Sequence, residues 1–316
     1  MMSTRPTLSA MTVPASIDAT GTSASSSSSS GLLDWALLVL PGLIWGTSFL
    51  FIAEGLDALA PDGVTFSRFL IGFLTLALVP GARRPVLARD RAGVFWLGVL
   101  WLAFPMSMFP HAEQHVSSAL TGMLNGAIPL IAAGVAALVA WRMPSQAVMG
   151  GLLVGVAGAV LMAMPGLGAG GNSARGVLMI MAALVSYGVA INLARPLQQR
   201  NGALPVVWRA LGVALILTAP LGAPALFAAQ WSARSLLAIL ALGCLGTAVA
   251  NAIMAVAAGR LGPTRASATT FLIPVVALVL GVIVRGERVA LMAVGGGALC
   301  LAGAWLIRRG TMQRAQ

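Results

Sequence analysis

Residues 35–53 read Trp-Ala-Leu-Leu-Val-Leu-Pro-Gly-Leu-Ile-Trp-Gly-Thr-Ser-Phe-Leu-Phe-Ile-Ala, an uncharged stretch between Asp34 and Glu54. A helix of this length rises about 28 Å, close to the ~30 Å thickness of a bilayer hydrocarbon core. The stretch is longer than the apolar region of a secretory signal peptide, and no basic segment immediately precedes it. It therefore predicts a membrane-spanning helix.

The rest of the chain repeats this pattern. Hydrophobic residues make up 59% of the 316 residues and charged residues 9%, whereas soluble proteins carry about 25% charged residues. Glycine and proline mark most of the breaks between apolar windows. We therefore predict an all-α polytopic membrane protein with ten transmembrane helices, at about residues 35–53, 63–80, 93–110, 117–141, 147–164, 176–194, 205–228, 235–258, 266–284 and 289–307.

The chain before the first window has a different composition. Residues 1–30 end in the serine run from Ser25 to Ser30 and show no hydrophobic periodicity. Such a segment has too little apolar surface to offset the entropy lost on ordering. We expect a disordered tail.

An internal repeat divides the ten windows. Pro129 and Pro274 are 145 residues apart, as are Gly98 and Gly243. The period corresponds to five helices, which predicts one repeat at residues 31–165 and a second at residues 166–310. An odd number of helices makes the second repeat enter the membrane from the opposite side. Inverted repeats are typical of secondary transporters, with the substrate site near the midplane between the halves.

The formal charge of +11 comes from arginine alone, because the sequence contains no lysine. The arginines lie singly or in pairs between apolar windows, which argues against a nucleic-acid partner. Arginine concentrates in cytoplasmic loops of membrane proteins. The uneven distribution of arginine therefore predicts an integral protein of the cell (plasma) membrane with both termini in the cytoplasm. The arginine-rich side holds Arg83, Arg84, Arg89, Arg91, Arg142, Arg195, Arg200, Arg260, Arg265, Arg308, Arg309 and Arg314, and the other side holds Arg175, Arg234, Arg285 and Arg288.

Three stretches carry a family resemblance. The first is Leu43–Phe49 followed by Phe66–Phe69, the second runs from Ala119 to Leu130, and the third from Gly262 to Arg288. In the third, a small-residue run, Leu-Ile-Pro and Gly-Glu-Arg follow in order. Together the stretches resemble the EamA family of the drug/metabolite transporter superfamily, over about residues 35–308.

The resemblance implies ten helices, a central cavity lined mainly by helices 1, 3, 4, 6, 8 and 9, and export of amino acids or similar metabolites. At one position the two halves carry residues of opposite charge. Arg142 occupies the place in the first half that Glu287 holds in the second, so no pair of glutamates is expected there.

Pro129 and Pro274 fall near mid-span at matching places in the two halves. A proline frees the carbonyl four residues earlier, here those of Asn125 and Thr270. In hydrocarbon a free carbonyl needs a neighbouring group or a watery cavity. We therefore expect a substrate cavity lined by Asn125, Thr270 and the two prolines; the alternative is that the prolines only bend helices for packing.

Two aromatic residues and two arginines complete the candidate site. Trp45 in the first half corresponds to Tyr187 in the second, and we expect both to flank the cavity. Arg68 lies about six residues inside the second window, and Arg209 lies at the equivalent place. An intramembrane charge indicates function by default, although both side chains could instead reach the interface.

Few other residues suggest chemistry. His111 and His115 would share a helix face, but no third ligand is evident, so no metal site is expected. These residues and Glu113 are placed in a polar loop outside the membrane, and Glu54 ends the first helix. With no carboxylate in mid-span, the sequence leaves facilitated export or a relay through histidine open.

The function that these patterns favour is a secondary transporter, and not an enzyme, that exports small metabolites such as amino acids by alternating access. Its expected partners are a small-molecule solute and the lipid bilayer, with no cofactor and no nucleic acid. Glycines in the fifth and tenth windows suit close helix packing within one chain or a homodimer. The alternatives are a multidrug exporter and a membrane-embedded enzyme acting on a lipid-linked substrate.

Overall fold

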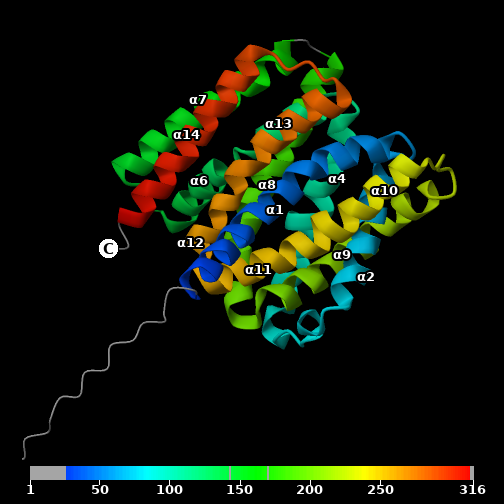
Figure 1. The fold of residues 1–316 in the computed structure, drawn as a ribbon, viewed down its shortest axis with the longest axis horizontal. Coiled ribbons are helices and arrows are strands. Elements are labelled where there is room, and N and C mark those ends of the chain that lie inside the picture. Colours follow the sequence, from blue (N-terminus) through cyan, green and yellow to red (C-terminus); the bar gives the residue numbers. More distant parts are fainter. Residues whose placement is uncertain (1–25, 142–143, 169–170, 314–316) are drawn as a thin grey trace, which may run out of the picture.

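The computed structural model describes residues 26–141, 144–168 and 171–313, and the regular elements in these ranges are helices (Figure 1). The first part contains α1 (Ser26–Leu56), α2 (Pro61–Ala77), η1 (Pro80–Arg83), η2 (Ala88–Asp90), α3 (Arg91–Leu97), η3 (Gly98–Ala103), α4 (Phe104–Glu113), α5 (Ser118–Asn125), α6 (Ile128–Ala140) and α7 (Gln146–Gly168). The second part contains α8 (Gly171–Asn201), α9 (Ala203–Ala225), α10 (Ala233–Ala241), η4 (Leu242–Val249), α11 (Ala250–Leu261), α12 (Pro263–Ala266), η5 (Ser267–Phe271), α13 (Leu272–Arg285) and α14 (Leu291–Gln313).

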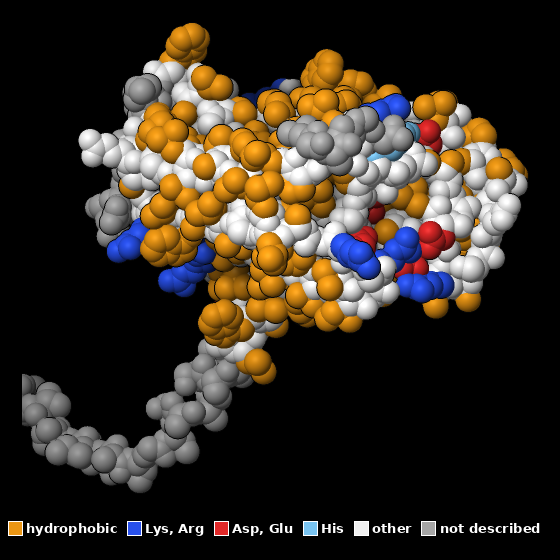
Figure 2. Space-filling model, turned by 90° about the horizontal axis from the view of Figure 1, so that it is seen from above, with side chains coloured by type: hydrophobic (Ala, Val, Ile, Leu, Met, Phe, Trp, Pro, Cys, Tyr) orange, Lys and Arg blue, Asp and Glu red, His pale blue; other side chains and the backbone are white. Residues whose placement is uncertain are grey.

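Nine helical stretches in the described ranges are long and apolar enough to cross a membrane. They run over Gly31–Leu56, Ala88–Glu113, Ser118–Leu138, Gln146–Pro165, Ser173–Asn201, Ala203–Ala225, Ala233–Leu261, Ser267–Arg285 and Leu291–Gly310. The tenth predicted span, residues 63–80, corresponds to α2, which has 17 residues and is not among the nine. Apolar side chains cover most of the face in Figure 2, as expected for a surface in contact with lipid.

The ends of the predicted spans shift in two places. Helix α1 begins at Ser26, so residues 26–30 of the expected tail are helical, while residues 1–25 lie outside the described residues. Helix α8 continues past residue 194 to Asn201. The extension is stabilised by Arg200 and Asn201, which both bind the Asp90 carboxylate.

Helices at equivalent places of the 145-residue period pack against each other in antiparallel pairs. The clearest pair is α7 and α14, which lie side by side in Figure 1. A Cβ at Gly151 would meet the backbone of Gly303, and one at Gly158 would meet the backbone of Gly296 and Cys300. Residues later in α7 therefore contact residues earlier in α14, so the two helices are antiparallel. The glycines let the two backbones approach closely, within one chain.

A second equivalent pair, α2 and α9, repeats this geometry, and so do α5 and α13, which are different parts of the equivalent stretches Ser118–Leu138 and Ser267–Arg285. In α2 and α9, Phe73 stacks on Trp208 with ring centroids 4.9 Å apart, while a Cβ at Gly222, near the other end of α9, would meet Phe66. In α5 and α13, a Cβ at Gly122 would meet Ala277, and one at Gly126 would meet Pro274. Both pairs are antiparallel, like α7 and α14.

The helices define two ends of the bundle, which we name after two acidic residues. The Glu54 end holds the C-terminal ends of α1, α4 and α13 and the N-terminal ends of α2, α5 and α10, where Glu54 pairs with Arg234. The Asp34 end holds the opposite ends of these helical stretches, where Asp34 pairs with Arg260. The first and last described residues, Ser26 and Gln313, both belong to helix ends on the Asp34 side.

Candidate functional site

Arg68 in α2 carries a buried guanidinium that forms no ion pair with a described carboxylate. The residue is 5% exposed, and its Nε donates a hydrogen bond of 2.9 Å to Thr247 Oγ1 in η4. Close packing of α2 on η4 makes this bond geometrically accessible. A Cβ at Gly243 would lie 3.1 Å from the Arg68 carbonyl oxygen, so only glycine lets the two backbones approach this closely.

The partner segment η4 is a π-helix, and a second π-helix, η3, lies almost exactly one period earlier in the chain. Such wide turns often occur at functional sites because they leave backbone groups available to side chains. In η4 the Thr247 hydroxyl donates to the carbonyl of Leu242, 3.1 Å away. The hydroxyl that holds Arg68 is thus itself oriented by the wide turn.

Each π-helix is also bound by a side chain from the other half. The indole Nε1 of Trp45 in α1 donates to the carbonyl of Gly246 in η4 at 3.0 Å. In the opposite sense, the hydroxyl of Ser186 in α8 donates to the carbonyl of Leu100 in η3 at 2.7 Å. Trp45 therefore has a partner in the interior, and its role is to join the two halves.

Tyr187, the counterpart of Trp45, lies in an aromatic cluster. Its ring stacks on Phe109 of α4 at 5.9 Å between centroids, and Phe109 meets Phe49 of α1 edge-on at 5.7 Å. Tyr187 is 7% exposed and lies within electrostatic range of Arg68. The tyrosine and the buried arginine thus belong to one region, between α2, α4 and α8.

Asn125 and Thr270, the expected polar pair, differ in the hydrogen bonds of their side chains. Asn125 ends α5, and its Oδ1 is buried without a hydrogen-bond partner among the described residues. The Thr270 hydroxyl donates to the carbonyl of Ser267 at 2.8 Å, within its own 3₁₀ turn. Neither proline lies in the middle of a helix as expected, because Pro129 is in the first turn of α6 and Pro274 in the first turn of α13, directly after η5. A proline in the first turn removes no intrahelical hydrogen bond.

Arg209 differs from its equivalent Arg68. It is half-buried, and its Nη1 donates weakly to the carbonyls of Pro205 and Ala82 at 3.3 and 3.5 Å. The guanidinium also lies 5.5 Å from the ring centroid of Trp208. These contacts with backbone and indole are those of an arginine at a helix end near the interface.

Ion pairs join helices at the Glu54 end. The Glu54 side chain is 5% exposed and binds two arginines from different helices: Arg234 of α10 and Arg285 of α13, the latter at 3.1 Å. Arg285 also binds Asp57 at 2.9 Å. The network ties α1 to α10 and α13.

Ion pairs and hydrogen bonds join helices at the Asp34 end as well. Arg260 of α11 binds Asp34 of α1 at 2.5 Å. Arg200 and Asn201 at the end of α8 bind the Asp90 carboxylate at the start of α3, both at 2.7 Å. Polar bonds between residues far apart in the sequence therefore join helices at both ends of the bundle.

The Gly-Glu-Arg stretch has a structural role at the Glu54 end. Gly286 adopts φ +65°, a left-handed conformation that ends α13 and favours glycine. The turn directs the Glu287 carboxylate onto the first turn of α5, where it accepts from the amides of Ser118 and Ala119 at 3.0 and 2.8 Å. A carboxylate at a helix N-terminus is stabilising. The corresponding first-half residue, Arg142, lies outside the described residues.

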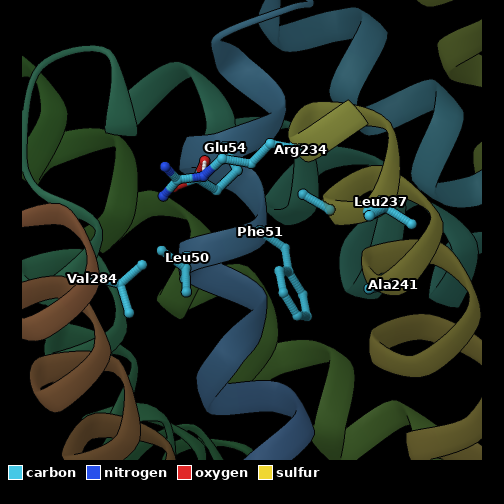
Figure 3. A pocket seen from close by; sticks show the side chains of 8 residues that line it. Leu50, Phe51, Glu54, Arg234, Leu237, Ala241 and Val284 are labelled. Carbon is cyan, nitrogen blue, oxygen red and sulfur yellow. Dashed lines mark hydrogen bonds and ion pairs between the residues drawn. The ribbon is translucent and has the colours of Figure 1, made fainter. Parts of the chain in front are cut away.

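An apolar groove of about 420 Å³ opens beside the ion pairs (Figure 3). Leu50 and Phe51 of α1 lie between Leu237 of α10 and Val284 of α13, and the paired Glu54 and Arg234 lie at one end of the groove. Its wall is almost entirely apolar, as expected where helices face lipid.

Glu113 and His111 do not lie in the loop between helices that the sequence predicts. Glu113 is the last residue of α4 instead of a loop residue, and both of its carboxylate oxygens are buried. His111 also lies within α4, with Nδ1 2.9 Å from the carbonyl oxygen of Ser107 and Nε2 3.7 Å from Asp62. The described residues hold no group of three His, Cys, Asp or Glu side chains that suits a metal ion.

Sequence reasoning also missed Thr247, Ser186 and the partners of Glu54. Threonine and serine in apolar helices carry no strong signal, because they often bond to their own backbone. The arginines at 234 and 285 were assigned to loops, and their convergence on Glu54 depends on tertiary packing.

Comparison with known proteins agrees with this architecture. The model of the EamA-like transporter family matches residues 34–164 and 174–309. A protein of Streptantibioticus cattleyicolor named "Probable terminal-alkyne amino-acid exporter" is 30% identical over 89% of this chain and 94% of its own length. The "Uncharacterized inner membrane transporter YedA" of Escherichia coli is 28% identical over 78% of this chain and 81% of its own length. A solved structure titled "Crystal structure of protein" has a TM-score of 0.56 at 22% identity, covering 88% of this chain and 96% of that one.

Apolar spanning helices around a buried guanidinium, with ion pairs at both ends, define a polytopic helical membrane protein. The chain belongs to the EamA-like transporter family. It is therefore an integral membrane transporter of small metabolites, as the resemblance indicates, and the two relatives above are named as an exporter and a transporter.

Proposed function

We propose that the protein is a secondary exporter of amino-acid-like solutes, which works by alternating access between two inverted five-helix repeats, residues 31–165 and 166–310. The observation that carries the proposal is the antiparallel contact of two helix pairs at equivalent places of the period, α7 with α14 and α2 with α9. A two-fold axis in the membrane plane brings equivalent helices together in this orientation. A repeat without inversion would place them parallel.

The proposal counts α2 as the tenth span. Its 17 residues rise about 25 Å, which is short for the hydrocarbon core but within the range of spanning helices. Helix α2 packs on α9, α4 and η4, so little of it depends on contact with lipid. Protein contacts of this kind also accommodate Arg68 inside the span.

Alternating access requires a polar site that opens to one side at a time. Arg68 and Glu113 supply buried charge within the bundle. The pairs Glu54–Arg234 and Asp34–Arg260 join helices at opposite ends, and such bonds can break at one end while they hold at the other. The site that we propose includes Asn125 and Tyr187, with Trp45, Thr270 and the prolines shaping the helices around it.

The arginine-rich side of the chain corresponds to the Asp34 end. We therefore place the Asp34 end, and with it both termini, on the cytoplasmic side of the cell membrane. Export then runs from the Asp34 end to the Glu54 end. We propose no cofactor and no nucleic-acid partner. The glycine faces of α7 and α14 are used within one chain, and a homodimer would need another surface.

The solute class rests on two supports. The relative from Streptantibioticus cattleyicolor is named as an exporter of a terminal-alkyne amino acid. A zwitterion also suits a site that holds one buried guanidinium and one buried carboxylate, since each charge of the solute finds an opposite charge.

Counterflow in proteoliposomes tests the proposal. Vesicles loaded with propargylglycine, a terminal-alkyne amino acid, should transiently accumulate the radiolabelled compound, and empty vesicles should not. A second set loaded with ethidium tests multidrug export. Absence of propargylglycine counterflow in protein that remains folded would contradict the proposal. Covalent turnover of a lipid-linked sugar without flux would support a membrane-embedded enzyme instead.

A further inference from the structure

Glu113 differs from the other acidic residues of the Glu54 end. Both of its oxygens are buried, and no described residue donates a hydrogen bond to either one. By contrast, Glu54 binds two arginines, and Glu287 accepts from the amides of α5. An ionised carboxylate buried without a partner costs several kcal/mol, so Glu113 requires a proton or a cation.

The helices packed on α4 supply charge but no direct partner. Arg68 of α2 lies within electrostatic range of Glu113, as do Arg285 and Glu287 near the end of α13. No ion pair joins Arg68 to any described carboxylate within 4.0 Å. The guanidinium and the carboxylate thus influence each other without contact.

The other segments packed on α4 also supply no group that binds the Glu113 carboxyl among the described residues. Helix α8 contributes Tyr187 and the exposed Arg175, which is next to Gly176 where α8 packs on the end of α4, and α1 contributes Glu54, which is already paired. Asp62 of α2 lies 3.7 Å from His111. Segments α5 and η3, which also pack on α4, contain no titratable side chain.

We propose that Glu113 binds the coupling proton, and that the proton and the ammonium group of the solute compete for its carboxylate. This inference rests on the proposed function. In the state open to the cytoplasm, protonated Glu113 exchanges its proton for the ammonium, and the proton leaves to the cytoplasm. In the state open to the outside, a proton replaces the ammonium and the solute leaves.

Charge balance gives the stoichiometry. One proton enters for each zwitterion that leaves, so each cycle carries one positive charge inward. Arg68 takes the carboxylate of the solute and is not itself titrated. Export is then driven by both the proton gradient and the membrane potential.

Proton release on binding is the direct test. Addition of propargylglycine to wild-type protein in weakly buffered detergent should release protons to an indicator dye. Its apparent Kd should rise about tenfold for each pH unit below the pKa of the carboxyl, since proton and solute exclude each other. Glu113→Gln should release no proton and bind weakly at every pH, and Glu113→Asp should restore a pH-dependent Kd.

The matched control is Asp62→Asn, which removes a carboxylate from the same end on the adjacent helix. This variant should release protons as wild type does. Equal release from Glu113→Gln, or a pH-independent Kd in wild type, would overturn the proposal. Loss of release in Asp62→Asn alone would assign the proton to the Asp62–His111 pair and overturn it as well.

Infrared spectroscopy of the protein in lipid separates this inference from the proposed function. Wild type should show the band of a protonated carboxyl that disappears as pH rises, and Glu113→Gln should lack it. If counterflow of propargylglycine fails in wild type, the proposed function fails, while the band still decides whether Glu113 exchanges protons. Absence of the band in wild type would overturn the assignment.

Discussion

Arg68 and Arg209 occupy equivalent places in the two halves, yet the structure gives them different surroundings. Arg68 is 5% exposed and bound to a threonine hydroxyl of the other half. Arg209 bonds weakly to nearby carbonyls and lies over Trp208. The difference teaches that the two halves pack their helices in similar ways but place different polar contacts around equivalent residues.

The same division appears elsewhere in the molecule. Both halves contain a π-helix bound by a side chain from the other half. Only η4 presents a hydroxyl to an arginine, because the place of Thr247 in η3 is taken by an apolar residue, Leu102. If this asymmetry marks the transport site, substitutions in the two halves should have unequal effects.

Arg68→Ala should have the largest effect. The change leaves the Thr247 hydroxyl without its partner and removes the buried charge that we assign to the solute carboxylate. We expect counterflow of propargylglycine to fall by roughly 100-fold, equivalent to about 2.7 kcal/mol. Flux per folded molecule, measured in proteoliposomes with protein abundance quantified, checks this. Wild-type kinetics in a well-folded Arg68→Ala protein would remove Arg68 from the site.

Thr247→Val should have the next largest effect. It keeps the side-chain volume and removes the hydroxyl that orients the guanidinium. Loss of one partner of a buried hydrogen bond costs about 1–3 kcal/mol, so we expect flux to fall roughly tenfold. Thr247→Ser is the matched control and should retain most activity. Equal activity in the valine and serine variants would show that the bond does not position Arg68.

Asn125→Ala and Thr270→Ala form the third comparison. The buried Oδ1 of Asn125 has no hydrogen-bond partner among the described residues, whereas the Thr270 hydroxyl bonds within its own turn. We expect Asn125→Ala to weaken solute binding about three- to tenfold, the value of one hydrogen bond. Thr270→Ala should change the Kd by less than about twofold. Equilibrium binding of labelled propargylglycine measures both, and the reverse order would contradict the unequal assignment.

Arg209→Ala should have the smallest effect on transport. Its hydrogen bonds are 3.3–3.5 Å long, at the weak limit for N–H···O contacts. We expect flux per molecule within about twofold of wild type, with a modest loss of thermal stability or abundance. Thermal unfolding, measured together with counterflow, distinguishes a loss of stability from a loss of transport. A collapse of flux without loss of folded protein would make the two arginines functionally alike.

The sequence predicted the scaffold better than the site. Apolar windows and the period of 145 residues locate the spans, because lipid forces backbone polar groups into helices. The short α2 falls outside the nine long stretches, because it has 17 residues. Its packing on α9 and η4 depends on tertiary contacts, which hydropathy does not contain.

The site depends on contacts that spacing cannot reveal. The prolines drew attention to Asn125 and Thr270, but only the structure distinguishes a free amide oxygen from a hydroxyl bonded in its own turn. The sequence predicts Glu113 in a loop, because the third apolar window ends at residue 110, three residues before the end of α4. A shift of that size decides whether a carboxylate lies in water or in the interior.

The central claim is that the two ends open in alternation around the interior site. Spin labels at Ala60 and Phe227 report on the Glu54 end, and labels at Arg89 and Arg265 report on the Asp34 end, after removal of the native Cys244 and Cys300. Pulsed electron resonance in lipid should show that propargylglycine shifts the two distances in opposite directions. Counterflow accompanied by no change, or by shifts in the same direction at both ends, would contradict alternating access.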